Sequence, residues 1–255
     1  MRSASNHFAL LVVALVLLAT AGAFGASHDN GDLPKKFNRP PYTKMSLSVG
    51  SPNRGWQLRA KRLRQNRFLY VKPNSRARVY GHPALVLMLQ RTARQMAREA
   101  GGVQLLVGDL SSEYGGPLSG HHSHQSGRDA DVGFFVTDAD GRPARPHRLV
   151  AFDAEGHAKD GSGLVFDDYR NWLMVQMWLR DQRAEVKYVF VATCLRRRLL
   201  DFARARPAFR KYVSDASRLL LQPRNASAHD DHFHVRITCP KRQKGLCIED
   251  GYVND

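Results

Sequence analysis

The chain has 255 residues, of which 43% are hydrophobic, a size that supports one sizeable core or at most two small domains. Its 39 Lys and Arg residues outnumber 23 Asp and Glu residues. The formal net charge of +16 favours an anionic partner, such as nucleic acid, a lipid surface or a carboxylate-bearing polymer. After residue 26 no segment is apolar enough to span a bilayer, which excludes a protein with several transmembrane helices.

The first 26 residues have the pattern of a secretory signal peptide. Arg2 precedes a short apolar run over 8–18, and small residues at 21–23 predict cleavage near residues 23–26. The apolar run is too short to favour an anchor that stays in the membrane. We therefore expect an exported, periplasmic protein without stable membrane insertion. For such a protein nucleic acid is a poor partner, and a polymer of the cell envelope is a better one.

The next part of the chain is irregular as far as residue 45. Leu47 and Val49 then alternate as in a strand, and Pro, Asn and Gly residues within 51–55 predict a turn. Residues 56–75 are rich in Arg and Lys and show no clean period. This part therefore predicts one short strand and little else.

Apolar periodicity then predicts helices and strands in mixed order. Pro83 suits the start of a helix over about 83–100, and Asp167 or Asp168 suits the cap of another that runs to about residue 179. The other expected elements are strands at 103–107 and 132–136, a loop or flap at 138–166, a strand at 186–193, helices near 196–205 and 208–221, and a strand at 233–238. Helices and strands do not alternate regularly. We therefore expect an α+β fold, with residues 27–255 forming a single domain around a central antiparallel sheet flanked by helices.

Six of the eleven histidines fall into two short clusters that also contain aspartates. The first cluster holds His121, His122, His124, Asp129 and Asp131, and the second holds His229, Asp230, Asp231, His232 and His234. Histidine and aspartate are ligands that a borderline metal such as zinc accepts. Clusters this rich in His and Asp and poor in Cys indicate a catalytic metal with an open position rather than a structural one.

The second cluster opens a predicted strand, where successive side chains point to opposite faces. His232, His234 and Arg236 therefore share one face, and the apolar residues between them face the core. Two imidazoles about 7 Å apart along a strand can divide the work, one binding metal and the other reaching a metal-bound water or the substrate. His229 precedes them in a turn and is also within reach.

The first cluster leads to the same arrangement. His124 precedes Asp131 across Gly127, which permits a sharp turn, so both side chains can converge on one ion. One histidine from the second cluster completes three protein ligands, and a water fills the fourth position. Such a site lowers the pKa of the water toward about 7 and polarises a carbonyl. We expect one zinc ion on the face of the sheet.

Other residues of the clusters have supporting or plainer interpretations. Asp129, Asp230 and Asp231 suit the orientation of the imidazoles. A plainer interpretation of Asp129 and Asp131 is that they are turn-forming acids. Arg128 and Arg236 suit binding of substrate carboxylates, and a solvated surface charge accounts equally well for Arg128. The histidines without an expected role are His122, which is a neighbour of better candidates, and His7, His28, His82, His147 and His157, which are expected on the surface.

Three cysteines are compatible with one disulfide in an exported protein. Cys239 and Cys247 bracket a short loop, and we expect these two to pair. Cys194 ends an apolar run and is expected to be a small buried hydrophobic side chain, although pairing with one of the others stays open.

At the two histidine clusters the chain resembles the penicillin-insensitive murein endopeptidases, exported metallopeptidases of the lysostaphin, D-Ala-D-Ala-peptidase and hedgehog fold group. Residues 121–131 meet the pattern His-x-x-His-Gln-x-Gly-x-Asp-x-Asp, and residues 229–236 meet His-Asp-Asp-His-Phe-His-Val-Arg in full. Weaker similarity at 50–55, 80–83 and 222–224 extends the resemblance over about residues 46–240.

The resemblance implies a ligand set and a reaction. Zinc would be held by His124, Asp131 and His234, with His232 as the catalytic base or transition-state stabiliser. His121 and His229 match further family histidines near the metal. The implied reaction is hydrolysis of peptidoglycan cross-links, chiefly between D-alanine and diaminopimelate, by a metal-activated water. No serine nucleophile takes part, and the substrate-binding residues are not identified.

Three alternatives remain open from the sequence. A carboxypeptidase that trims terminal D-alanine would share this zinc site. A non-catalytic wall-binding protein is disfavoured because every proposed ligand and His232 are present. A basic metal-dependent nuclease fits the charge and the clusters but not the export signal.

Overall fold

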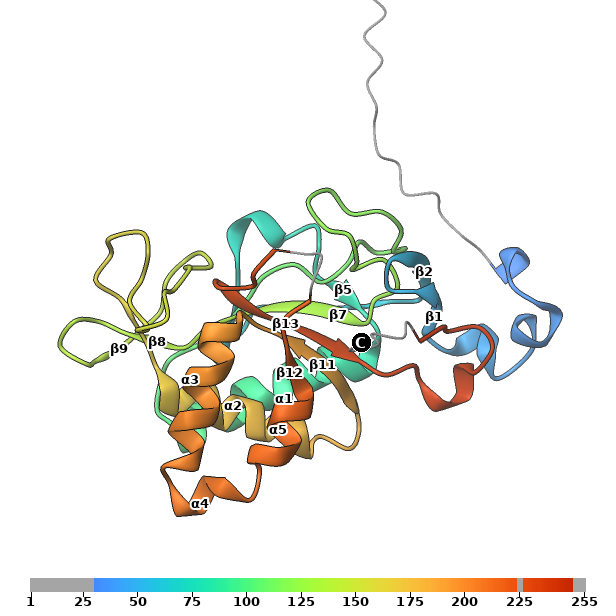
Figure 1. Cartoon of the computed structure of the whole chain (residues 1–255). Helices are drawn as coiled ribbons and strands as arrows, with labels where there is room; N and C mark the ends of the chain where they lie inside the picture. Colours follow the sequence, from blue (N-terminus) through green and yellow to red (C-terminus); the bar gives the residue numbers. More distant parts are fainter. Residues whose placement is uncertain (1–29, 224–226, 250–255) are drawn as a thin grey trace, which may run out of the picture.

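The computed structural model describes residues 30–223 and 227–249. A six-stranded sheet runs through the centre, and the α-helices lie against one of its faces, below the sheet in Figure 1. The main hydrophobic core fills the space between this face and the helices. The opposite face carries loops and a small hairpin, and it is the face that presents the histidine clusters.

The central sheet is mixed: neighbouring strands are antiparallel in its middle and parallel at its two edges. In spatial order they are β12 (Leu220–Leu221), β11 (Val186–Phe190), β13 (His232–Ile237), β7 (Asp129–Gly133), β6 (Leu105–Val107) and β4 (Leu69–Val71). The pairs from β11 to β6 are antiparallel, whereas the pairs β11–β12 and β4–β6 at the edges are parallel. The expected α+β class with a central sheet is confirmed, although the sheet is antiparallel only in its middle and parallel at both edges.

The helices begin with local signals that the sequence carries. They are α1 (Pro83–Glu99), α2 (Asp168–Arg180), α3 (Thr193–Arg204), α4 (Pro207–Arg210) and α5 (Val213–Leu219). Asp167 caps α2 by accepting a hydrogen bond from the backbone N–H of Arg170 at 3.0 Å. His82 caps α1 by accepting from the N–H of Ala84 through Nδ1 at 3.2 Å. The expectation that His82 is an inert surface residue was therefore wrong.

Two expected elements differ in the structure. The helix expected at 208–221 is divided into α4 and α5, and the chain then leaves the helix so that Leu220, fully buried, pairs with Val189. Burial against the neighbouring strand outweighs the helical period here. The strand expected at 132–136 is divided. Its first part belongs to β7, which begins at Asp129 because Asp129 already pairs with Arg236 of β13, and which ends at Gly133; Val136 begins a strand of another sheet.

Smaller sheets surround the central one. They are the hairpin β1 (Leu47–Ser51) with β2 (Arg54–Leu58), the ribbon β3 (Lys61–Arg62) with β5 (Tyr80–Gly81), and a three-stranded sheet of β8 (Val136–Thr137), β9 (Pro143–Ala144) and β10 (Val165–Phe166). The three-stranded sheet lies within and beside the expected flap. Short 3-10 turns cover Asn30–Asp32, Lys35–Asn38, Tyr42–Lys44, Pro73–Ser75 and Lys241–Gln243. Phe37 packs with Leu47 and Leu246 in a second small apolar cluster, which anchors the irregular N-terminal part to the hairpin.

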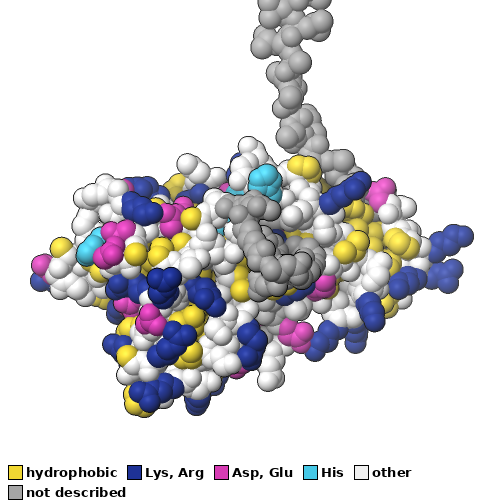
Figure 2. All heavy atoms as spheres, viewed as in Figure 1, with side chains coloured by type: hydrophobic (Ala, Val, Ile, Leu, Met, Phe, Trp, Pro, Cys, Tyr) yellow, Lys and Arg dark blue, Asp and Glu magenta, His cyan; other side chains and the backbone are white. Residues whose placement is uncertain are grey.

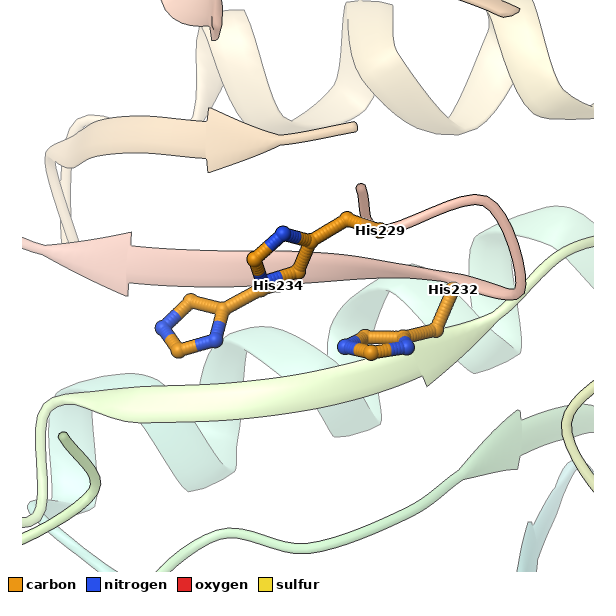
Figure 3. A group of neighbouring side chains, drawn as sticks. All are labelled: His229, His232 and His234. Carbon is orange, nitrogen blue, oxygen red and sulfur yellow. The ribbon is translucent and has the colours of Figure 1, made fainter. Parts of the chain in front are cut away.

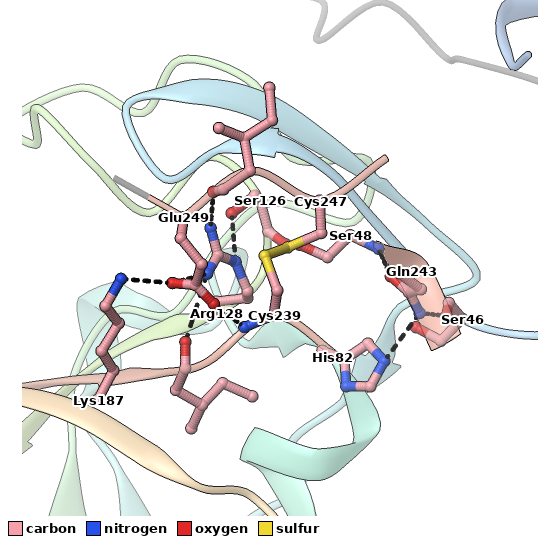
Figure 4. Close-up of a disulfide and its surroundings, with 12 residues drawn as sticks. Ser46, Ser48, His82, Ser126, Arg128, Lys187, Cys239, Gln243, Cys247 and Glu249 are labelled. Atoms are coloured by element: carbon pink, nitrogen blue, oxygen red, sulfur yellow. Dashed lines mark hydrogen bonds and ion pairs between the residues drawn. A yellow bond between two sulfur atoms is a disulfide. The ribbon is translucent and has the colours of Figure 1, made fainter. Parts of the chain in front are cut away.

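A disulfide and a buried arginine fasten the C-terminal segment to this framework (Figure 4). Cys239 and Cys247 are joined, which confirms the expected pair, and Cys194 is a free, half-buried thiol. Arg128 is fully buried, which contradicts both a solvated charge and a substrate ligand. Its guanidinium donates to the carbonyl of Ile248 at 2.8 Å and pairs with Glu249 at 3.5 Å. Partners from distant sequence thus satisfy a charge that is costly to bury alone.

The expected signal peptide at residues 1–26 lies outside the described residues. Within 30–223 and 227–249, no helix has the length and apolar character needed to cross a membrane.

Candidate metal centre

The two histidine clusters meet because β7 and β13 are neighbouring antiparallel strands. In their register His234 lies opposite Asp131, and Arg236 lies opposite Asp129. The alternation along β13 sends Phe233 into the helical core, with no exposed surface, and sends His232 and His234 to the other face. Figure 3 shows these two imidazoles on the same side of β13, extending toward β7.

A sharp turn at Gly127, just before β7, brings His124 to the same face. Gly127 has φ of 73°, and a Cβ there would meet Gln57 Oε1 at 1.9 Å, so both the conformation and the space require glycine. His124 itself has φ of 68°, an uncommon value for a residue with a side chain. The turn is fixed by the β1–β2 hairpin, since Gln125 donates its backbone N–H to Pro52 O at 3.0 Å.

Three imidazoles converge on a single oxygen, Oδ1 of Asp131. His124 Nε2 and His232 Nε2 both lie 3.2 Å from it, and His234 Nδ1 lies 3.5 Å from it. Three of the residues expected at the metal and the expected catalytic histidine are thus brought together in one buried cluster.

The far nitrogen of each imidazole has a hydrogen-bond partner that sets its tautomer. His124 Nδ1 donates to the carbonyl of Leu110 at 2.5 Å, and His234 Nε2 donates to Asp129 Oδ1 at 2.9 Å. His232 Nδ1 lies 2.5 Å from Asp231 Oδ1. A neutral imidazole that donates through one nitrogen carries a lone pair on the other. In their neutral forms, His124 and His234 therefore direct a lone pair toward the Asp131 carboxylate.

This arrangement fits a metal ion. Within the described residues, His124 Nε2 and Asp131 Oδ1 are both buried and neither forms a hydrogen bond. Facing lone pairs on buried atoms repel one another unless a proton or a cation lies between them, and orphaned buried polar atoms are costly. Two imidazoles and one carboxylate are a donor set that suits zinc, with a position left open for catalysis.

The electrostatics of the cluster also favour a cation. Burial opposes charge on His232, yet Asp131 and Asp231 outweigh it and raise the pKa of His232 to about 10. Burial would also raise the pKa of Asp131, but His124 and His232 hold it well below its usual range. His234 differs, because burial lowers its pKa to about 3 despite Asp129 and leaves it a neutral ligand near neutral pH.

Asp129 links the strands below the cluster. Its Oδ1 accepts from His234 Nε2 and also from Arg236 Nε at 2.6 Å, while Oδ2 accepts from the backbone N–H of His124 at 3.2 Å. Asp129 is fully buried, and burial acts to raise its pKa, but Arg236 and His234 together hold the pKa far below its usual range. One carboxylate thus orients a histidine from each cluster. Arg236, expected to bind substrate carboxylates, is itself buried and pairs with Asp129.

The two aspartates of the second cluster, Asp230 and Asp231, have different partners. Asp231 contacts His232, as expected for an orienting residue. Among the described residues, the Asp230 carboxylate pairs with Lys159 Nζ at 2.7 Å rather than with an imidazole, and its backbone carbonyl accepts from Phe152 N. Asp230 therefore ties the second cluster to the 138–166 segment instead of orienting a ligand.

His121 and His229 flank the three converging imidazoles. His121 Nδ1 lies 4.0 Å from Asp131 Oδ2, and the ligand atoms of His121, His124 and Asp131 lie within 4.8 Å of one another. The ligand atoms of His229, His232 and His234 form a second such group, shown in Figure 3. Burial, followed by the neighbouring His232, lowers the pKa of His229 to about 4.

A cavity of about 130 Å³ opens beside the cluster. Its wall includes His121, His229, His234, Phe190 and Arg236, and the exposed His122 also lines it. Asn53 from the β1–β2 turn also lines it, so the hairpin contributes both to the framework and to the cavity. The cavity gives a substrate access to one side of the cluster.

Asp109 was not identified from the sequence. It is almost fully buried, and its Oδ2 lies 2.9 Å from His121 Nε2 and 3.1 Å from Arg78 Nη1. Burial acts to raise its pKa, but His121, Ser75 and nearby basic groups lower the pKa to about 2. The sequence signal that would have identified Asp109 is its position, an acid two residues after the buried strand at 105–107.

Comparisons with known proteins agree with this geometry. The sequence profile of a family described as penicillin-insensitive murein endopeptidase matches residues 48–253, which include both histidine clusters. Three similar proteins bear the name penicillin-insensitive murein endopeptidase and come from Escherichia coli O6:K15:H31 (strain 536 / UPEC), O1:K1 / APEC and strain SMS-3-5. Each is 28% identical to the chain over 232 residues, which cover 90% of this chain and 77% of the relative. The fold, the paired clusters and this match together place the chain in the family of penicillin-insensitive murein endopeptidases, which are metallopeptidases.

Proposed function

We propose that the protein hydrolyses D-alanyl-diaminopimelyl cross-links of peptidoglycan with one zinc ion held by His124, Asp131 and His234. The observation that carries the proposal is the convergence of three imidazole nitrogens on Asp131 Oδ1 within 3.5 Å. Membership of a murein endopeptidase family supports the substrate class. When bound, zinc supplies Lewis-acid chemistry, polarising a carbonyl and lowering the pKa of water toward about 7.

His232 is the proposed catalytic residue. Its Nε2 faces the same Asp131 oxygen as the two ligand imidazoles do. Its Nδ1 lies 2.5 Å from Asp231 Oδ1. This carboxylate keeps the ring oriented and stabilises its protonated form, so Nε2 can hold or release a proton at the reacting centre. His232 is therefore positioned to move a proton or to donate to the developing oxyanion.

Asp129 and Asp231 act through the imidazoles that they contact. Asp129 fixes the His234 ring and the backbone of His124, and Asp231 fixes His232. His121 and His229 flank the centre and line the cavity, where they are placed to contact a bound peptide. We assign them a supporting role at the site.

The protein acts outside the cytoplasm in this proposal. Residues 1–26 serve as the signal peptide, with cleavage near residues 23–26, and residues 27–255 form the periplasmic enzyme. A substrate in the cell wall and the net charge of +16 are consistent with this location.

Mass analysis of muropeptides tests the proposal. Purified sacculi are digested by the wild type with and without a chelator, and zinc is then restored to the chelated sample. We expect cross-linked dimers to be converted to monomers, this activity to stop with the chelator and to return with zinc.

Matched variants locate the activity. His234→Ala should abolish it, whereas His157→Ala, at an exposed histidine outside both clusters and the cavity, should leave it unchanged. Release of free D-alanine with the cross-links intact would instead identify a carboxypeptidase. Binding to sacculi with no released product would identify a wall-binding protein.

A further inference from the structure

The net positive charge of the chain originates in one stretch. Residues 33–98 contain 16 Lys and Arg residues and neither Asp nor Glu, and the other 23 Lys and Arg residues are balanced by the 23 acids. Figure 2 shows the consequence on one face. Acidic side chains lie among the basic ones near α3 and α4, whereas basic side chains dominate the end formed by the N-terminal turns. Such an asymmetry produces a positive potential over one part of the surface.

A groove within this basic stretch lies between the β3–β5 ribbon and β4, the edge strand of the central sheet. Its volume is about 450 Å³, and the residues that line it are Arg62, Leu63, Arg64, Gln65, Val71, Arg76 and Val79. The apolar side chains of Leu63, Val71 and Val79 are buried and form its floor. Three exposed arginines line the same groove. The groove therefore offers an apolar base and several cationic groups.

Among the residues that the structure describes, two of the three groove arginines lack the acidic partners that several other exposed arginines have. Arg142, Arg204 and Arg218 each pair with an aspartate two or three residues away. In contrast, within 30–223 and 227–249, Arg64 and Arg76 form neither a hydrogen bond nor an ion pair, and the stretch offers them no local acid. Arg62 lies over the ring of Tyr80, with 6.0 Å from its guanidinium carbon to the ring centroid. The guanidinium forks of Arg64 and Arg76 are available for an external anion.

The groove also connects to the metal centre through a short chain of contacts. Arg78 adjoins Val79 of the groove floor and pairs with Asp109 at 3.1 Å, and Asp109 in turn contacts His121. These contacts link the strand that borders the groove to a histidine that flanks the metal centre. Separate sites along one polymer raise the effective concentration of its bonds at the reacting centre.

We propose that this groove is an exosite that binds carboxylate-bearing stem peptides of peptidoglycan away from the bond that is cleaved. The inference rests on the proposed function, which supplies a polymeric substrate. Arginine forks match carboxylates in a bidentate geometry, and the apolar floor suits the methyl groups of the alanines that flank the carboxylate-bearing residues. The groove thereby favours the intact, multivalent wall over small soluble fragments.

The test compares insoluble sacculi with a soluble cross-linked muropeptide dimer. In the triple variant Arg62→Gln/Arg64→Gln/Arg76→Gln we expect unchanged turnover of the soluble dimer. Binding to sacculi, measured by sedimentation with chelator present, should fall about tenfold, since each exposed ion pair contributes on the order of a factor of two to three. The salt dependence of the remaining binding should also become weaker.

A matched control separates the groove from net charge. Arg142→Gln/Arg204→Gln/Arg218→Gln removes the same three charges from exposed arginines that have local partners. It should change sacculus binding by less than about twofold, because those charges are already neutralised locally. Replacing the groove arginines by lysine should restore part of the binding, and thermal unfolding checks that each variant folds.

Several results would overturn the exosite. They are equal losses in the groove and control variants, loss of turnover on the soluble dimer, or loss of binding to phosphatidylglycerol vesicles with sacculus binding unchanged. The last result would assign the groove to a phosphate-bearing surface. If the wild type cleaves neither substrate, the proposed function fails, whereas the sedimentation comparison still decides whether the groove binds stem peptides.

Discussion

Two histidines show how differently two regions of this molecule handle charge. Burial opposes the cation at both, but Asp131 and Asp231 raise the pKa of His232 to about 10 at the metal centre. In the basic stretch, burial lowers the pKa of His82 to about 4, with Arg128 adding to the effect. The metal centre thus collects carboxylates that favour a cation, whereas the basic stretch has none and favours an external anion. The first region suits catalysis, and the second suits attachment.

Removal of a proposed metal ligand should have the largest effect, because it abolishes the cation-binding character of the metal centre and leaves the basic stretch unchanged. Asp131→Ala deletes the oxygen on which three imidazoles converge, and His234→Ala deletes one of those imidazoles. Both variants should lose the metal, and their hydrolysis of sacculi should fall to the level of the chelated wild type. Metal analysis of the purified proteins together with muropeptide release measures this. Full activity in a folded, metal-free variant would contradict the ligand assignment.

His232→Ala should separate chemistry from metal binding. We expect turnover to fall on the order of 10²–10⁴-fold, the usual contribution of a positioned proton-transfer group. The zinc content should stay at the wild-type value, because His124, Asp131 and His234 remain. Parallel loss of zinc would show that His232 is a ligand.

Asp129→Asn tests the carboxylate that orients a histidine from each cluster. The affinity for zinc should weaken about 10–100-fold, because the hydrogen bonds to His234 and the His124 backbone are disturbed. Asp230→Asn is the matched control, since its partner is Lys159 and not an imidazole. Competition with a chromophoric chelator measures both, and equal affinities in the two variants would contradict the assigned roles.

The smallest effect on activity is expected from His82, which tests the basic stretch. The pKa of His82 is lower in the folded state, at about 4, than its ordinary value of 6.5, so the unfolded chain binds more protons between these values. The contribution of His82 to the free energy of unfolding is therefore fully present above pH 6.5. It is lost as the pH falls toward 4, and the loss amounts to about 3 kcal/mol. His82→Asn keeps a capping oxygen for α1 but does not titrate.

We expect this variant to lose less stability than the wild type across that interval while cleaving sacculi normally at neutral pH. Urea unfolding at several pH values measures the difference. Identical pH profiles for the two proteins would show that His82 is not held neutral by its surroundings.

The sequence predicted those parts of the fold and the site that depend only on residues close together in the chain. Strand alternation placed His232 and His234 on one face, and Gly127 indicated the turn that brings His124 to Asp131, because both arguments use only backbone geometry. The helix at 83–100 and the Cys239–Cys247 pair also follow from short sequence spans.

The differences arise where distant residues decide. Arg128 was expected either to bind a substrate carboxylate or to be a solvated surface charge. Instead it is buried, and its guanidinium is bound by carbonyls and a carboxylate from residues more than a hundred positions later. Asp230 resembles Asp231 in sequence, yet Lys159 of the 138–166 segment determines its direction. The helix expected at 208–221 ends early because Leu220 pairs with β11. Asp109 contacts His121 only because the chain folds back between β6 and β7.

Anomalous diffraction at the zinc absorption edge, from crystals of the zinc-loaded protein, is the most direct test of the central claim. We predict one peak per chain, roughly 2.0–2.2 Å from His124 Nε2, an Asp131 carboxylate oxygen and His234 Nδ1, with His232 outside bonding distance. A peak bound instead by His229 and His232, or no peak near Asp131, would contradict the account.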